Sequence, residues 1–221
     1  MVYVYSYFIY CAYFILDWVV VLITELLYRL RKEEFLKHKR EANVYWVSDL
    51  IKCPIKREFE IKYPEIALTN IYSPYYILGD LIHKGLESIV SENLGAQVEV
   101  EKSRDVQLSN GKKVVVKGRI DCIITTEEGE KVGIEIKSAR ADIGIPQQHH
   151  IDQVKIYNWL FDLSRSILIY VTYNRVTEYE ITERASMEEV IYRIEDRRAP
   201  RYPWECNYCI YSILCPYKIT K

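Results

Sequence analysis

Two carboxylates and a lysine are brought together by the pattern of two neighbouring predicted strands. Apolar residues alternate along residues 132–137, so a strand there places Glu135 and Lys137 on the same face. The preceding predicted strand carries Asp121, which a hairpin would set beside Glu135. Two adjacent carboxylates repel each other unless a cation lies between them. Because hard divalent cations prefer oxygen ligands, the pair predicts a Mg²⁺ or Mn²⁺ site.

A cation at this position would suit the hydrolysis of a phosphodiester bond. It would polarise a phosphoryl oxygen and activate a water, while Lys137 could position that water and offset the developing charge. The alternative is a plain surface ion pair between Glu135 and Lys137 on a solvated strand. The presence of Asp121 on the neighbouring strand favours the metal site.

Four cysteines form a second group that could bind a cofactor. Cys206, Cys209 and Cys215 are closely spaced, whereas Cys53 stands far away in the sequence. Four thiolates bind either zinc or an iron–sulfur cluster. Zinc sites more often use two close pairs, and here the division is one plus three, with proline after Cys53 and after Cys215. The pattern therefore favours a 4Fe–4S cluster, with zinc or no metal as alternatives.

The composition is that of an ordinary globular protein. The 221 residues, 49% of them hydrophobic, suffice for one α/β domain with an extension. The formal net charge is −1, so a DNA-binding surface would have to be a local basic strip. Six cysteines are too few for a secreted disulfide scaffold of this length, which favours the cytoplasm. The cysteines outside the group of four, expected to be small buried residues, are Cys11 and Cys122.

Hydrophobic periodicity predicts a mixed sheet with helices packed on it. A long helical pattern precedes three alternating segments that are separated by turn signals, and a second helix and further strands follow. The Asn110-Gly111 pair predicts a tight hairpin. The predicted helices span residues 46–60 (or begin at Pro54), 77–93, 150–163 and 186–197, and the predicted strands span 97–108, 113–125, 132–138, 167–173 and 177–181.

The first 27 residues are mostly apolar and precede a basic stretch at residues 29–40. Asp17 lies in the middle of the apolar stretch, and a charge at the centre of a bilayer costs about 3 kcal/mol. We therefore expect a helix that packs against the protein or a second copy of the chain, rather than a membrane span. This interpretation predicts a homo-oligomer.

The order of several polar residues resembles one nuclease family. Asp121 followed by residues 135–137 resembles the PD-(D/E)XK nuclease signature. Gln153 and Tyr157, on the next predicted helix, resemble the Q-x-x-x-Y motif of its RecB-like branch, and His83 resembles the first-helix histidine of that branch. The resemblance implies the restriction-endonuclease-like α/β fold of this family.

The resemblance also implies a role for each residue. Lys137 would serve the hydrolytic step, and Gln153 and Tyr157 would line the DNA side of the site. An imidazole among oxygen ligands would favour Mn²⁺ somewhat over Mg²⁺. The implied metal ligands are His83, Asp121, Glu135 and the backbone carbonyl of Ile136.

The one-plus-three cysteine pattern is similar to that of the CRISPR-associated exonucleases, which carry an iron–sulfur cluster. The resemblance covers residues 46–221 as a nuclease domain and leaves residues 1–45 as an extension. It implies an exonuclease that degrades single-stranded DNA from the 5′ end during spacer acquisition, with other CRISPR adaptation proteins as partners. A DNA-repair nuclease of the same fold and a non-catalytic, cluster-bearing DNA-binding subunit are the alternatives.

Overall fold

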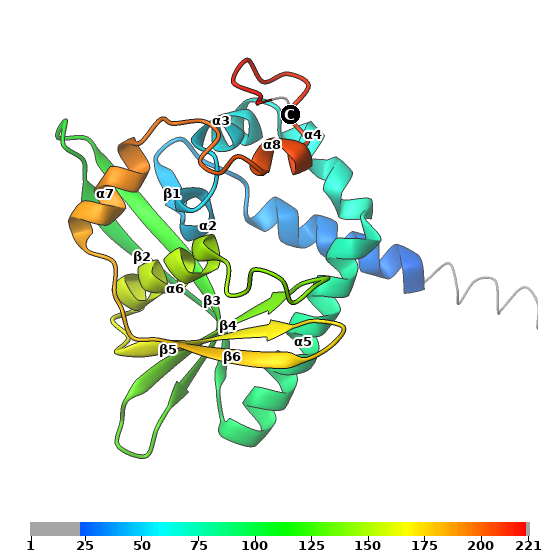
Figure 1. Ribbon diagram of the computed structural model, residues 1–221, viewed down its shortest axis with the longest axis vertical. Helices are drawn as coiled ribbons and strands as arrows, with labels where there is room; N and C mark the ends of the chain where they lie inside the picture. The colour runs from blue at the N-terminus through cyan, green and yellow to red at the C-terminus, as the bar shows by residue number, and fades with distance from the viewer. Residues whose placement is uncertain (1–22, 220–221) are drawn as a thin grey trace, which may run out of the picture.

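The computed structural model describes residues 23–219, which form a six-stranded mixed sheet with helices on both faces (Figure 1). The first and third strands pair in parallel, as do the fourth and fifth, and the other pairs are antiparallel. The third strand is central, because it pairs with the first, second and fourth. The strands are β1 (Val44–Trp46), β2 (Gln97–Gln107), β3 (Lys113–Thr125), β4 (Lys131–Ser138), β5 (Arg165–Val171) and β6 (Val176–Ile181).

Two helices cover the sheet from opposite sides. Helix α5 (Pro74–Leu94) packs on one face, and α6 (Gln148–Phe161) packs on the other. A proline begins α5, where its missing N–H costs nothing. Gly95, with a φ of 62°, ends α5 in the left-handed conformation that glycine adopts without strain.

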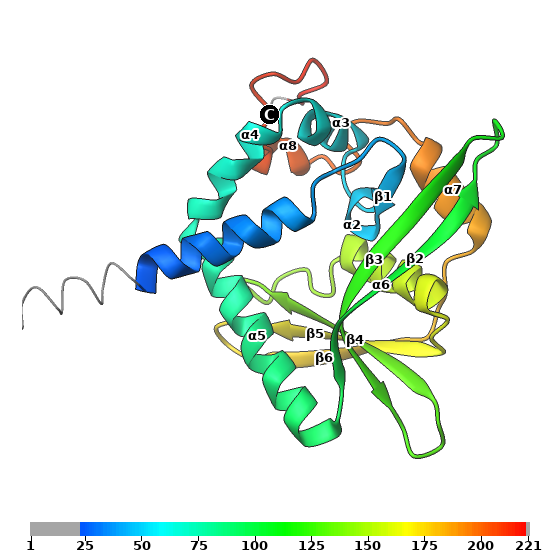
Figure 2. The ribbon, with the colours of Figure 1, turned by 180° about the vertical axis from the view of Figure 1, so that it is seen from behind.

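Shorter helices join these elements at the end of the molecule that carries the C-terminal segment. Figure 1 shows this segment, in red, close to α3. Figure 2 shows the first described helix, residues 23–37 in blue, crossing α5. The remaining helices are α2 (Val47–Leu50), α3 (Pro54–Lys62), α4 (Pro64–Ala67), the 3₁₀ helix η1 (Leu68–Tyr72), α7 (Met187–Glu195) and α8 (Glu205–Tyr208).

The hydrophobic core lies on both faces of the sheet. Ile120 of β3 packs with Leu160 of α6 on one side, and Ile134 and Ile136 of β4 pack with Val90 of α5 on the other. Strand β4 is therefore buried on both faces, because α5 covers one face of the sheet and α6 covers the other. Its Glu135 face is not solvated, so the alternative of a plain surface ion pair is wrong.

The predicted mixed sheet flanked by helices is confirmed, but the predicted helix at residues 46–60 is wrong. Trp46 ends strand β1, and Cys53 separates α2 from α3. The alternative that a helix begins at Pro54 is confirmed. The physical reason is that proline has no N–H to donate and disfavours the helical conformation in the residue before it.

The N-terminal prediction falls mainly on residues 1–22, which lie outside the described residues. Within residues 23–219, no helix is long and apolar enough to cross a membrane. Ion pairs Arg31–Asp80 and Glu34–Arg119 hold the helix at residues 23–37 against α5 and β3. Strand β1 spans the predicted domain boundary at residue 45, and the division into two domains stays a prediction.

Candidate active site

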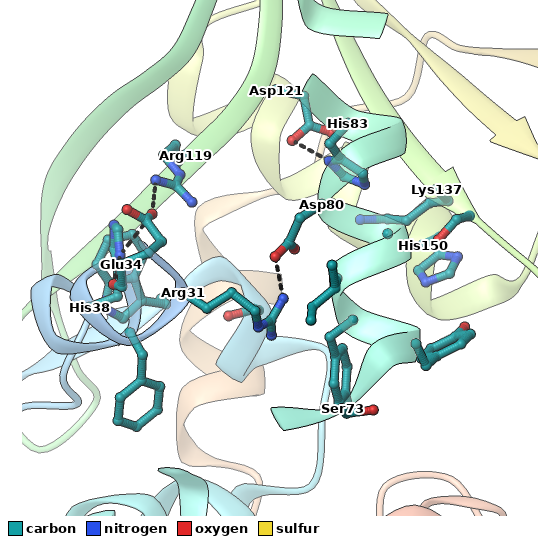
Figure 3. Close-up of a pocket in the computed structure, with 18 of the residues that line it drawn as sticks. Arg31, Glu34, His38, Ser73, Asp80, His83, Arg119, Asp121, Lys137 and His150 are labelled. Atoms are coloured by element: carbon teal, nitrogen blue, oxygen red, sulfur yellow. Dashed lines mark hydrogen bonds and ion pairs between the residues drawn. The ribbon is translucent and has the colours of Figure 1, made fainter. Parts of the chain in front are cut away.

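Asp121 of β3 and His83 of α5 face each other across the interface between sheet and helix (Figure 3). The imidazole Nδ1 lies 3.4 Å from the Asp121 Oδ1, and the Asp121 Oδ2 accepts a hydrogen bond of 2.6 Å from the backbone N–H of Ile136. The latter bond ties β3 to β4 at the position where both predicted carboxylates stand. The expected pairing of the two acidic strands is therefore present.

Glu87 completes a group of potential metal ligands with His83 and Asp121. One ligand atom from each of the three lies within 4.8 Å of the other two. Sequence reasoning did not select Glu87, although it follows His83 by four positions, which places both side chains on one face of α5. One imidazole and two carboxylates in this arrangement can hold a divalent cation.

Glu135 lies next to this group and is 2% exposed. Its Oε1 accepts hydrogen bonds from the Lys137 Nζ and from the Gln153 Nε2, the latter at 2.8 Å. Its Oε2 is buried and has no hydrogen-bond partner among the described residues. Buried polar atoms are nearly always paired, so this oxygen fits a site that a cation completes.

The surroundings of the two carboxylates shift their pKa values in opposite directions. Burial raises the pKa of Glu135 to about 7, and the charge of Asp121 adds to the shift. Burial also opposes ionisation of Asp121, but the hydrogen bond and charge of His83, the charge of Lys137 and the N–H of Ile136 together outweigh it and lower the pKa of Asp121. Burial lowers the pKa of His83, but the hydrogen bond to Asp121 and the charge of that carboxylate together outweigh it, so the pKa of His83 is raised. A positive charge beside Glu135 would favour ionisation of both carboxylates.

Gln153 and Tyr157 of α6 are buried and connect the two acidic strands. The Gln153 Nε2 donates to Glu135 and also to the Tyr157 Oη, the latter at 3.1 Å. The Tyr157 Oη donates to the backbone carbonyl of Arg119 at 2.8 Å. Burial raises the pKa of Tyr157 well above its usual value, so the phenol stays a donor. Tyr157 lines the cleft that opens over the site, whereas Gln153 is buried behind Glu135 and does not line the cleft.

A cleft of about 2100 Å³ opens over the site. It is bounded by the helix at residues 23–37, by α5, by the beginning of α6 and by the C-terminal segment. Figure 3 shows Arg31, Arg119 and Lys137 among the residues that line it. The cleft thus contains basic side chains that could contact a polyanion, although several of them, such as Arg31 and Arg119, also pair with acidic residues of the same lining. The other basic lining residues are Lys37, Lys39, Arg40, Lys84 and Arg140.

The four cysteines of the one-plus-three pattern line a second cavity of about 210 Å³. Burial raises the pKa of the Cys53 and Cys209 thiols, and neighbouring cysteines add to both shifts. No three cysteine sulfurs within residues 23–219 lie within 4.8 Å of one another. The residues lining the cavity include Cys53, Cys206, Cys209 and Cys215.

The two remaining cysteines were expected to be small buried residues. Cys122 is fully buried beside Asp121, which confirms that expectation. Cys11 lies outside the described residues.

No protein-family model matches the chain. A curated relative, the CRISPR-associated exonuclease Cas4 of Saccharolobus solfataricus, is 42% identical over 203 residues, which are 90% of this chain and 100% of the relative. The chain belongs to the Cas4 family. The crystal structure of SSO0001 is also 42% identical, covers 90% of this chain and 98% of its own, and superposes with a TM-score of 0.87.

Membership of the Cas4 family confirms the predicted family, fold class and enzyme class. The chain is a CRISPR-associated exonuclease of the RecB-like fold, and hence a deoxyribonuclease. Nucleases of this family use a divalent metal, and the cluster of His83, Glu87 and Asp121 is a possible site for it.

Proposed function

We propose that this Cas4-family chain degrades single-stranded DNA from its 5′ end during the acquisition of CRISPR spacers. It would act in the cytoplasm, as a homo-oligomer and with other CRISPR adaptation proteins. The nuclease assignment of these residues rests on the convergence of His83, Glu87 and Asp121 beside the Oε2 of Glu135, which has no hydrogen-bond partner in the described part of the chain. These groups stand at a cleft large enough for a nucleic-acid strand.

The proposed metal is Mn²⁺ or Mg²⁺, with Mn²⁺ favoured by the imidazole ligand. When bound, it would polarise a phosphoryl oxygen and lower the pKa of a water molecule. Glu87 is added here to the ligands expected from the sequence, because its carboxylate shares the cluster. The ligands of the proposal are His83, Glu87, Asp121, Glu135 and the backbone carbonyl of Ile136.

Lys137 would supply positive charge beside the scissile phosphate. Its Nζ donates to Glu135, so the ammonium is held at the edge of the carboxylate group and lines the cleft. From there it can orient the attacking water and offset the negative charge that develops on the phosphoryl oxygens. Gln153 would hold the Glu135 carboxylate in position, and Tyr157 would hold strand β3, through the hydrogen bonds described above.

We propose a 4Fe–4S cluster in the cysteine-lined cavity. A water molecule occupies about 30 Å³ in the liquid, and the cavity of about 210 Å³ is several times larger. That space suits a cluster better than a single ion. Cys53 begins α3 and the other three cysteines lie near the C-terminus, so the cluster would clasp the entrance of the proposed nuclease domain, residues 46–221, to its end.

The test is a cleavage assay on the full chain with 5′- and 3′-labelled oligonucleotides, single- and double-stranded, in Mn²⁺, Mg²⁺ or EDTA. Asp121→Asn and Glu135→Gln should abolish cleavage, because each removes a carboxylate charge from the metal site. Lys137→Ala should bind Mn²⁺ as the wild type does but cleave more slowly. Glu92→Gln, on the exposed side of α5, is the matched control.

Single-nucleotide release from a 5′ label, with intact duplexes left behind, supports the proposed polarity and substrate. Wild-type cleavage rates from freshly repurified Asp121→Asn protein would overturn the assignment of the site.

A further inference from the structure

Aromatic rings from two distant segments form one wall of the cleft. Trp204 and Tyr202, from the C-terminal segment, are stacked with ring centroids 5.8 Å apart and an interplanar angle of 13°. His149, in the first turn of α6, packs against both, with centroids 5.1 Å from Trp204 and 5.7 Å from Tyr202. We call Tyr202, Trp204 and His149 the aromatic wall.

The aromatic wall is open to the cleft that also contains the metal-ligand group. Trp204 is 43% exposed, and the three rings line the same cleft as His83, Asp121 and Lys137. Trp204 is one of several large apolar side chains that are exposed on this cleft, and a ring that is nearly half exposed has a face free to contact a ligand. Burial lowers the pKa of His149 to about 4, with Lys137 adding to the shift, so its ring is uncharged at neutral pH.

We propose that the aromatic wall stacks on an unpaired base of the DNA strand, next to the phosphate that is cleaved. The inference rests on the proposed function and deepens it, because it identifies residues that select a single strand. Every base has a π face, so stacking on Trp204 is independent of sequence. In a duplex both faces of an interior base are already covered by its neighbours. A single strand can therefore engage the wall, whereas a duplex must first be unstacked.

The contacts around Glu205 link the aromatic wall to the cysteine cavity. One carboxylate oxygen of Glu205 accepts a hydrogen bond from the backbone N–H of Cys53 at 2.7 Å, and the other accepts from the backbone N–H of Tyr202 at 2.9 Å. Trp204 lines both the cleft and the cysteine cavity. The Tyr202 hydroxyl also donates to Asp152 of α6 at 3.2 Å. A cofactor bound by the cysteines would thus hold the wall in position over the active site.

The experiment measures binding of a labelled single-stranded oligonucleotide by the full chain in EDTA, where no cleavage occurs. Trp204→Leu keeps an apolar side chain against the cysteine cavity but removes the ring, and Trp204→Phe restores a ring. Tyr173→Ala, which removes a 78% exposed aromatic residue from the β5–β6 turn, is the control outside the cleft. Iron content and melting temperature are measured for each variant.

Stacking is worth about 1–3 kcal/mol per base, so Trp204→Leu should weaken binding about tenfold. Trp204→Phe should stay within about threefold of the wild type, and Tyr173→Ala should bind like the wild type. Scanning a single abasic site along the oligonucleotide should reveal one position at which the wild type loses about tenfold and Trp204→Leu loses little more.

Equal affinity of Trp204→Leu and the wild type, or an equal loss in Trp204→Leu at every abasic position, would overturn the proposal. If the wild type cleaves DNA in Mn²⁺ but Trp204→Leu binds with wild-type affinity, only the proposal of base stacking on the aromatic wall is refuted. A protein that shows the abasic pattern but cleaves no DNA refutes the proposed nuclease function and leaves the wall intact.

Discussion

The Tyr157 hydroxyl donates a hydrogen bond to the backbone carbonyl of Arg119, which fastens α6 to β3 two residues before Asp121. One turn earlier on α6, Gln153 donates to Glu135 of β4. The two side chains of the Q-x-x-x-Y pattern therefore bridge the strands that carry the two carboxylates, and they bond to each other. In this arrangement the motif sets the spacing of the acidic pair.

Tyr157→Phe should destabilise the protein and slow cleavage. The change removes the hydroxyl, and with it the bond to the carbonyl of Arg119 and the bond from the amide of Gln153. We expect a loss of about 1–3 kcal/mol in the free energy of unfolding, measured by urea denaturation. Tyr173→Phe, at an exposed site, should change it by less than about 0.5 kcal/mol. An unaltered unfolding midpoint for Tyr157→Phe would contradict the bridging role.

Gly118→Ala should have a similar effect through packing. A Cβ at this position would lie 2.7 Å from the Cδ2 of Leu160 and 2.9 Å from the Cε1 of Tyr157, both on α6. Overpacking of this kind costs about 1–3 kcal/mol. Gly85→Ala in α5 is the matched control, because its Cβ would meet nothing within 4 Å. The control should stabilise the helix by up to about 1 kcal/mol. Thermal melts of the two variants should therefore shift in opposite directions.

Glu87→Gln should weaken metal binding. The substitution keeps the shape of the side chain but removes one carboxylate from the group with His83 and Asp121. We expect the affinity for Mn²⁺, measured by calorimetry, to fall on the order of tenfold to a hundredfold. Glu92→Gln, whose side chain bonds to Ser88 on the exposed side of α5, should leave it unchanged. If both variants bind Mn²⁺ equally well, Glu87 is not a ligand.

Cys53→Ser should bleach a protein that is brown when purified. The thiolate at the start of α3 is the one ligand of the proposed cluster that lies far from the others in sequence, so its loss would open the longest loop that the cluster closes. Iron content and the melting temperature should both fall. Cys122→Ala, in the core beside Asp121, should retain the colour. Stoichiometric zinc without iron in the wild-type protein would rule the cluster out.

Removal of residues 1–27 should shift the protein from an oligomer towards a monomer. Leu26, Leu30 and Leu36 on the helix at residues 23–37 are exposed, and the sequence before them is mostly apolar, so we expect a partner surface. The full chain should elute in the absence of detergent at a mass well above 26.3 kDa. The ion pairs of Arg31 and Glu34 lie outside the deletion, so metal binding should persist. Recovery of the full chain only from detergent-extracted membranes would decide for a membrane anchor.

Much of the fold was predictable because the local pattern and the tertiary environment agree. Alternation along β3 and β4, with Asn110-Gly111 before β3, predicted the strands and placed Asp121 near Glu135. The helix predicted at residues 186–197 is present as α7, and the hydroxyl of Ser186 at its start accepts the backbone N–H of Glu189 at 3.0 Å. Short-range hydrogen bonds and side-chain direction within one element account for these successes.

The local pattern at residues 46–60 predicted one helix, whereas the structure has the end of a strand followed by two helices. Trp46 pairs in parallel with Lys117 of β3, a partner far away in the sequence. Asp49, in the short helix α2, accepts the Trp46 backbone N–H at 3.0 Å and forms an ion pair with Arg40, so this helix is capped directly at the end of the strand and stops after four residues.

Local sequence patterns specify which residue types are available and which face of its own helix or strand each one occupies. Tertiary structure alone decided that Glu87 joins His83 and Asp121, that Tyr157 reaches the carbonyl of Arg119, and that the C-terminal rings meet the first turn of α6. The physical reason is the distance along the chain over which each property is determined. The direction of a side chain follows from backbone periodicity within a few residues, whereas the distance between two elements depends on the packing of the whole core.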